Sequence, residues 1–180
     1  MNYQMTILST VAALGLAMGA AQAAKITIGV VLPYSGGAAQ FGEQIDRGMN
    51  LFMNQHKAAF GGHEIKLIKR DSKRPGGDIA KNAVQELITR QKVDLLTGFV
   101  FSPNAMASAP LVTQGKVPMV IMNAGTAWIP KLSPYIARVS FTMWHAGYPL
   151  GGYAKEKLSC NSAVIGSTSY PPGKDSRNAF

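Results

Sequence analysis

Cysteine is almost absent from this sequence of 180 residues, which contains only Cys160. A single thiol cannot form an intramolecular disulfide, and it cannot supply a metal site built on paired cysteines. Cys160 stands between a predicted helix and a predicted apolar strand, so we expect a buried, inert thiol. The three histidines, His56, His63 and His145, do not cluster with carboxylates at metal-ligand spacing. The sequence therefore predicts no metal site and no cofactor.

Motifs of nucleotide binding and of catalysis are also missing. The glycines Gly36, Gly37 and Gly42 lack the G-x-G-x-x-G spacing, and no Gly-Lys-Ser/Thr of the Walker type follows them. No G-x-S-x-G nucleophile elbow occurs, and no Ser/His/acid order is evident. These absences favour a protein that is not an enzyme, with an exported α/β hydrolase kept as an alternative.

Acidic residues are scarce: nine Asp and Glu stand against 18 Lys and Arg, which gives a formal net charge of +9. The densest basic cluster consists of Lys66, Lys69, Arg70, Lys73 and Arg74. No aromatic residue is interleaved for stacking on bases, and no recognised nucleic-acid module surrounds the cluster. We expect a solvated strand end and loop there, and no nucleic-acid partner.

No apolar run is long enough to cross a membrane, because a spanning helix needs about 20 residues. The longest run, residues 7–18, is followed by small residues that end in Ala21-Gln22-Ala23, an A-x-A cleavage pattern. Residues 1–23 are therefore predicted to be a signal peptide cleaved near Ala23, with the product in the periplasm. The segment before the run has no Lys or Arg, so the terminal amine is its only positive charge. No Cys lies near the cleavage point, which argues against a lipid anchor.

Apolar strands and amphipathic helices alternate through the next part of the chain. Strands are predicted at residues 26–32, 64–71, 93–101 and 117–122. Helices are predicted to begin near Gly42, Asp78 and Ser102, the last with Pro103 after a capping Ser102. This order favours an α/β fold with a doubly wound parallel sheet. We assign it to a first lobe, residues 24–138, that is incomplete.

A second unit is predicted after Arg138. It reads as a helix over residues 148–158, a strand at 163–166 and a loop at 167–175. An α/β unit with one strand cannot bury its faces alone. We therefore expect residues 139–180 to be the crossover into, and the start of, a truncated second lobe.

Several segments, taken in order, resemble the periplasmic binding proteins of the Leu/Ile/Val-binding type, the type I family. They are ITIGVVLPYSGGAAQFGEQIDRGMNLFMNQ, the KRDSKRPGGDIAKNAVQELITRQKVDLLTGFVFSPNAMASAP stretch, VPMVIMNAGTAWIPKL, RVSFTMWHAGYPLGGYA and SYPPGKDSRNAF. The last two are most similar to the branch that takes up aromatic or other hydrophobic carboxylates. The resemblance implies a solute-binding component of an ABC importer, monomeric at full length, whose partners are a small ligand and permease subunits. A sensor lobe feeding a receptor is the alternative within this fold.

Ligands of parallel sheets bind beyond the C-terminal ends of the strands, which points to three loops. Ser102 begins a helix, where free N–H groups and the helix dipole attract carboxylates. After the fourth strand, Ala124 and Gly125 let a ligand approach the backbone, and the Thr126 hydroxyl can donate to a carboxylate. For each residue a plain role as a cap or a turn is the alternative.

The third loop contributes Tyr34 and Ser35, which we place in the same mouth. At Phe41 the resemblance implies an aromatic ring over the ligand, with core packing as the alternative. Trp144 and Tyr148, near the crossover, face either the cleft or the interface between lobes. An amino acid and an aromatic acid both stay open as ligands, because the partner of a ligand ammonium would come from the second lobe.

Overall fold

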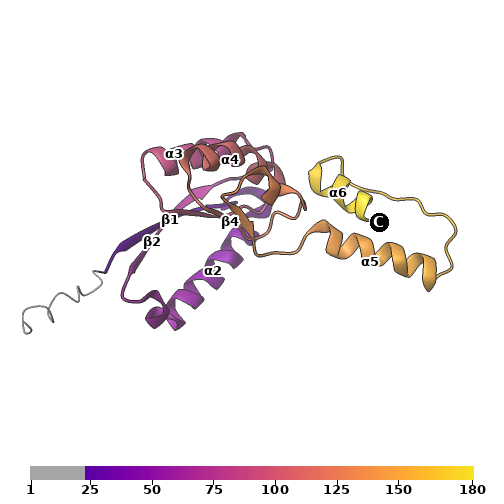
Figure 1. The fold of residues 1–180 in the computed structure, drawn as a ribbon, viewed down its shortest axis with the longest axis horizontal. Coiled ribbons are helices and arrows are strands. Elements are labelled where there is room, and N and C mark those ends of the chain that lie inside the picture. Colours follow the sequence, from indigo (N-terminus) through magenta and orange to yellow (C-terminus); the bar gives the residue numbers. More distant parts are fainter. Residues whose placement is uncertain (1–22) are drawn as a thin grey trace, which may run out of the picture.

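The computed structural model describes residues 23–180, in which a five-stranded parallel sheet is followed by a pair of helices (Figure 1). The sheet has the order β2-β1-β3-β4-β5, and every neighbouring pair is parallel. The strands are β1 (Lys25–Leu32), β2 (Glu64–Asp71), β3 (Leu95–Gly98), β4 (Met119–Ile121) and β5 (Ile136–Arg138). The predicted signal peptide lies outside the described residues, apart from the exposed Ala23.

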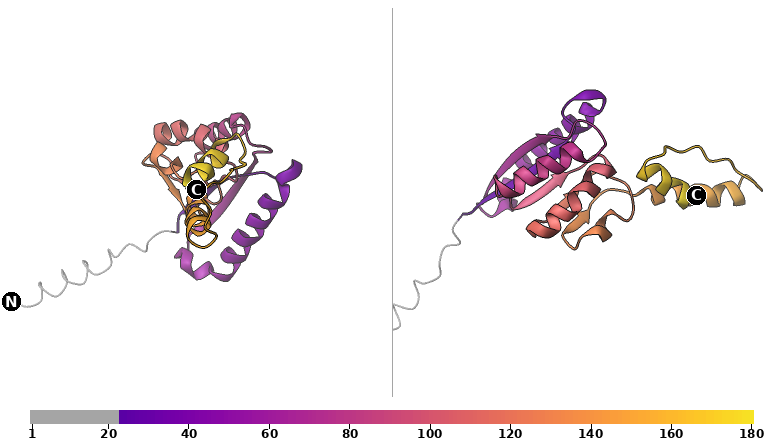
Figure 2. Two further views of the ribbon diagram at one scale, coloured as in Figure 1. Left: turned by 90° about the vertical axis from the view of Figure 1, so that its right-hand side faces the viewer. Right: turned by 90° about the horizontal axis from the view of Figure 1, so that it is seen from above.

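Helices cover both faces of the sheet, as Figures 1 and 2 show, so the doubly wound α/β fold expected from the sequence is confirmed. On one face lie α3 (Asp78–Thr89) and α4 (Ser102–Gly115), and on the other lies α2 (Ala39–Gln55). Short 3₁₀ turns lie in the connections between elements: η1 (Gly36–Ala38) before α2, η2 (Lys57–Phe60) after α2, and η3 (Ile129–Leu132) between β4 and β5.

The core is concentrated on the α3/α4 face. Val84 and Leu87 of α3 are fully buried against Leu96 of β3 and Val112 of α4, in one continuous cluster. The α2 face has a smaller cluster around Val30 and Leu32. The two sides of the sheet are therefore unequally covered.

The second unit consists of α5 (Met143–Glu156) and α6 (Pro171–Ala179), which lie side by side beyond the sheet (Figure 1). The two helices approach closely at glycines: a Cβ on Gly147 would stand 2.8 Å from the Ala179 Cβ. His145 completes a capping box at the start of α5, since its Nδ1 accepts the Thr142 N–H at 2.9 Å.

Three expectations for this unit are wrong. Residues 163–166 form no strand, because no neighbouring strand is present to pair with them, and Val164 is fully exposed. Cys160 is exposed, since the apolar layer expected to bury it is not formed. Helix α6 begins at Pro171, inside the predicted loop, because proline suits the first turn of a helix.

Element ends also shift within the first lobe. Helix α2 begins at Ala39, three residues before the predicted Gly42, and ends at Gln55. The predicted 93–101 and 117–122 strands shorten to β3 and β4, and β5 was not predicted. Among residues 23–180, no helix is long and apolar enough to cross a bilayer, and no three His, Cys, Asp or Glu side chains group as metal ligands.

Candidate functional site

The C-terminal ends of β3 and β4 bring Ser102 and Thr126 together. The two strands are neighbours in the sheet, so the loops that follow them are neighbours too. The Ser102 Oγ accepts a hydrogen bond from the Thr126 N–H at 3.2 Å, and both residues are buried. The convergence of these two loops, expected from the order of the strands, is what the structure shows.

Ser102 does not cap α4. The cap position belongs to Phe101, with Ser102 as the first helical residue, and no side-chain cap bond is formed. The plain alternative of an N-cap is therefore wrong at this position. The hydroxyl instead links the helix start to the 123–127 loop, with its own proton still available for donation.

Thr126 carries a polar atom without a partner. Its Oγ1 is buried and has no hydrogen bond within the part of the chain that the structure describes. A buried polar group without a partner costs about 1–3 kcal/mol. An acceptor supplied from elsewhere, such as a ligand oxygen, would offset that cost.

Arg138, at the end of β5, organises the same loop from its other side. Its guanidinium donates to the carbonyl oxygens of Ala124 at 3.4 Å, Thr126 at 2.7 Å and Ala127 at 3.2 Å. Burial lowers the pKa of Arg138 from its ordinary value, and the nearby Asp175 carboxylate opposes that shift. The Arg138 guanidinium therefore holds the loop through hydrogen bonds to three of its carbonyl oxygens.

The polar atoms of Tyr34 and Ser35 bind inside the first lobe. The Asp71 carboxylate accepts the Tyr34 N–H at 2.8 Å and the Ser35 hydroxyl at 2.6 Å, while the Tyr34 hydroxyl donates to Asp46 at 3.0 Å. Burial raises the pKa of Asp71, but hydrogen bonds from Ser35, Tyr34 and Lys73 outweigh burial and leave that pKa lowered. Burial, then Asp46, raises the pKa of Tyr34. Ligand contact by these two residues stays a prediction.

Phe41 lies in the first turn of α2 with 43% of its surface exposed. The alternative of core packing therefore does not hold for this ring. The next residue, Gly42, is buried against the loop after β1. A Cβ at this position would stand 2.1 Å from the Pro33 carbonyl oxygen, so a larger residue does not fit. This close approach fixes the start of α2 against the loop after β1.

Sequence reasoning missed a cavity of about 400 Å³ that is lined by residues of both units, including the two neighbours of the buried Ser102 in the sequence. The lining residues are Pro75, Gly76, Phe101, Pro103 and Tyr170. Tyr170 precedes α6, in a segment expected to be a loop, so its aromatic side chain was the one available signal. The walls are aromatic rings and proline rings, with no carboxylate among them.

A buried asparagine holds the floor of this cavity in place. The Asn104 Oδ1 accepts the Gly77 N–H at 3.0 Å, and its Nδ2 donates to the Arg74 carbonyl at 3.1 Å. Gly77 has φ 92°, and a Cβ there would stand 2.7 Å from the Ala107 Cβ. The loop after β2 is thereby fixed to α4, next to Phe101 and Pro103.

The site thus combines a doubly wound parallel sheet, two hydroxyl residues at adjacent strand ends and a cavity shared with the α5–α6 unit. The chain belongs to the periplasmic binding protein family, whose model matches residues 25–180. Its fold is that of the type I members.

Three relatives illustrate the match. The Leu/Ile/Val-binding protein homolog 6 of Brucella abortus is 36% identical over 173 residues, which cover 96% of this chain and 44% of that protein. A solute binding protein of an ABC transporter from R. palustris, in complex with 4-hydroxybenzoate, is 40% identical, with a TM-score of 0.81. The match covers 87% of this chain and 42% of that protein.

Another from Rhodopseudomonas palustris BisB5, in complex with 3,4-dihydroxy benzoic acid, is 36% identical, with a TM-score of 0.80. The match covers 86% of this chain and 42% of that protein. The chain thus spans less than half the length of these relatives.

Proposed function

We propose that this chain is part of the solute-binding component of an ABC importer and that its ligand is an aromatic carboxylate held between two lobes. The observation that carries the proposal is the cavity beside Ser102, where Phe101 and Tyr170 stand with Pro75 and Pro103. Flat rings suit an aromatic ligand, because aromatic pairs gain from stacked and edge-to-face contacts. The R. palustris relatives crystallised with hydroxybenzoates support this ligand class.

The mechanism follows from the two loops. A ligand carboxylate accepts hydrogen bonds from the Ser102 and Thr126 hydroxyls at the start of α4, where the helix dipole favours negative charge. Ala124 and Gly125 belong to the same loop as Thr126, and Phe41 is 43% exposed at the start of α2. Ligand contact by these three residues stays a prediction. Hinge closure of the second lobe then encloses the ligand.

A branched-chain or hydrophobic amino acid is the second candidate, favoured by the relatives named for Leu, Ile and Val. An amino acid requires an acceptor for its ammonium group. That acceptor would come from the second lobe, so the aromatic carboxylate is placed first on the aromatic lining of the cavity and on the R. palustris relatives. Ligand sensing for a receptor would use the same site.

The proposal has four further parts. The protein is exported to the periplasm, is monomeric at full length, has permease subunits as partners and does not turn its ligand over. We expect the mature N-terminus at Ala24 or Lys25, as Ala21-Gln22-Ala23 predicts. N-terminal sequencing of the secreted product checks this, and a mature protein that retains Met1 contradicts export.

Calorimetry on the full-length protein tests the ligand class. We expect micromolar or tighter binding of 4-hydroxybenzoate or benzoate, recovered chemically unchanged, and much weaker binding of leucine. The matched comparison is benzyl alcohol, which keeps the ring and lacks the carboxylate. Tight leucine binding without binding of the aromatic acids would replace the first candidate with the second, and multiple turnovers of the ligand would favour an enzyme.

A further inference from the structure

The 123–127 loop is held from the second unit as well as from the sheet. The Met143 N–H, at the start of α5, donates to the Gly125 carbonyl oxygen at 2.9 Å. Gly125 also packs against this residue, since a Cβ there would stand 3.1 Å from the Met143 Cε and would require that side chain to shift. The loop that carries Thr126 is therefore a contact surface between the two units.

Asp175 makes the main side-chain link across this surface. This residue of α6 is 7% exposed, and its Oδ2 accepts the Ala127 N–H at 2.8 Å while its Oδ1 accepts the Trp144 indole N–H at 3.0 Å. One carboxylate thus joins α6, α5 and the 123–127 loop. Figure 1 shows α6 on the side of the second unit that faces the sheet.

Arg138 and Asp175 act on the loop in complementary ways. Arg138 binds the carbonyl oxygens of Ala124, Thr126 and Ala127, and Asp175 binds the N–H of Ala127. The two donors bind different oxygens of Asp175, so an asparagine there would place its NH₂ group, which cannot accept, opposite one of them. Opposite charges on the two residues also stabilise each other in this buried setting.

We propose that Asp175 and Arg138 are positioning residues that fix the backbone of the 123–127 loop, so that the Ser102–Thr126 pair has its binding geometry only while α6 is docked. The ligand-binding part of this inference rests on the proposed function. The structural part, that Asp175 holds the loop, does not. Because coupling between two events is reciprocal, ligand binding and docking of α6 stabilise each other.

The first test needs no ligand. In the full-length protein, hydrogen exchange of the Ala127 amide and the NMR signal of the Trp144 indole N–H report the link directly. We expect Asp175→Asn to speed Ala127 exchange about tenfold or more and to shift the indole signal. The matched control is Asp94→Asn, since the Asp94 carboxylate accepts the Thr27 N–H at 2.7 Å at the opposite end of the strands. An unchanged Ala127 amide and indole in Asp175→Asn would overturn the inference.

The second test measures the dissociation rate of 4-hydroxybenzoate. Loss of the link should raise the dissociation rate about tenfold in Asp175→Asn while the association rate changes little. Trp144→Phe, which keeps an aromatic ring and removes one donor, serves if Asp175→Asn does not fold, and it should show a smaller effect in the same direction. Equal rates in Asp175→Asn and Asp94→Asn contradict the inference. If the wild type binds no aromatic carboxylate, the proposed function fails and the exchange experiment still decides on Asp175.

Discussion

Ser102 and Thr126 form one hydrogen-bonded pair, yet their side chains have different tasks. The Ser102 hydroxyl contributes to the fold, since it accepts a hydrogen bond from the buried Thr126 N–H. The Thr126 hydroxyl is buried and is not used by the described residues. A substitution at each position therefore separates a structural contribution from a contribution to binding.

Thr126→Val replaces the unpartnered hydroxyl by a methyl group of similar size. We expect ligand-free stability to stay equal or to rise, because a buried polar atom without a partner disappears. Ligand affinity should fall by about tenfold to a hundredfold, since a hydrogen bond to a charged group contributes about 1.5–3 kcal/mol. Calorimetric titration beside thermal melts checks both values, and unchanged affinity would remove Thr126 from the site.

Ser102→Ala should reduce stability as well as affinity. The Thr126 N–H would lose its acceptor in a buried place, which lowers the free energy of unfolding by about 1–3 kcal/mol. Denaturant unfolding of the ligand-free protein measures this loss. A variant as stable as the wild type, with unchanged affinity, would mean that the 3.2 Å contact contributes nothing.

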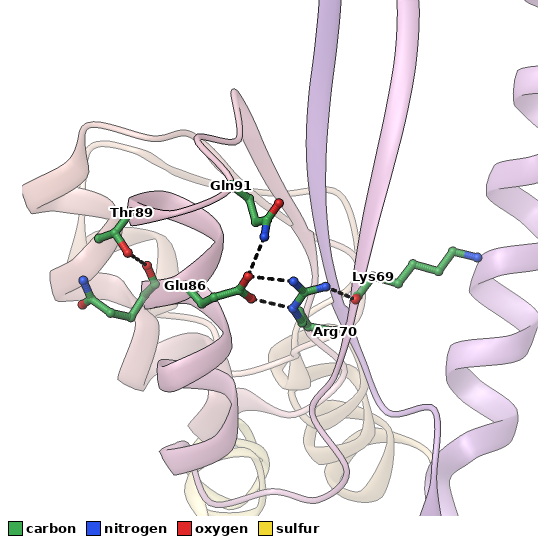
Figure 3. Close-up of polar contacts among 6 residues, drawn as sticks. Lys69, Arg70, Glu86, Thr89 and Gln91 are labelled. Atoms are coloured by element: carbon green, nitrogen blue, oxygen red, sulfur yellow. Dashed lines mark hydrogen bonds and ion pairs between the residues drawn. The ribbon is translucent and has the colours of Figure 1, made fainter.

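At the scale of elements, an ion pair joins β2 to α3. Arg70 donates to Glu86 through two nitrogens, at 2.5 and 2.7 Å, and Gln91 donates to the same carboxylate at 2.8 Å (Figure 3). Arg70 precedes Asp71, which holds the loop after β1. The pair therefore ties α3 to the end of β2, next to the carboxylate that holds the loop after β1.

The Arg70–Glu86 pair predicts how stability depends on acid. Hydrogen bonds from Arg70 and then Gln91 lower the pKa of Glu86 from 4.5 to about 2. Because the folded-state pKa is the lower one, the contribution is complete above about pH 4.5 and is lost as the pH falls toward 2. Thermal melts across this range should show a flatter pH dependence for Glu86→Gln than for the wild type. Glu64→Gln, at an exposed ion pair, is the control and should follow the wild type.

The sequence predicts those elements that have a strong local pattern. Residues 64–71 are predicted as a strand and form β2 with the same bounds, and α3 begins at Asp78 as predicted. Strand β5 has only three residues, with just Ile136 buried, so it has no periodicity to detect. The place of Thr126 near Ser102 could be predicted, because each of the two residues follows a strand of the parallel sheet. Tyr170 and Asp175 do not, because their roles depend on how α6 meets a loop almost 50 residues earlier in the chain.

At the scale of the whole molecule, the α2 side of the sheet is open. A groove of about 540 Å³ runs between α2 and the strands, with almost entirely apolar lining. It is lined by Ile28, Ile45, Gly48, Met49, Phe52, Met53, Phe60, Ile65, Leu67, Leu95, Thr97, Val120 and Met122. Phe52 is 53% exposed on its wall. Apolar surface of this extent promotes association and dye binding.

The 180-residue chain should therefore bind an apolar fluorescent dye. Phe52→Gln should lower the dye signal while changing the free energy of unfolding by no more than about 0.5 kcal/mol, since the side chain is half exposed. Leu51→Gln is the matched control, because Leu51 is 57% exposed on the same helix but does not line the groove. Equal dye signals from the two variants would place the dye elsewhere.

The order β2-β1-β3-β4-β5 has a consequence for how the chain acquires its structure. β1 comes first along the chain, yet it lies inside the sheet and pairs with both β2 and β3. Both partners arrive only after helix-containing crossovers, so early contacts are few and distant pairings must close large loops, which slows folding. During synthesis β1 lacks both neighbours until residue 71 has emerged, and one of its edges stays unpaired until residue 98. In that interval the unpaired edges of β1 can pair with wrong strands, a risk that helpers which shield the strand would reduce.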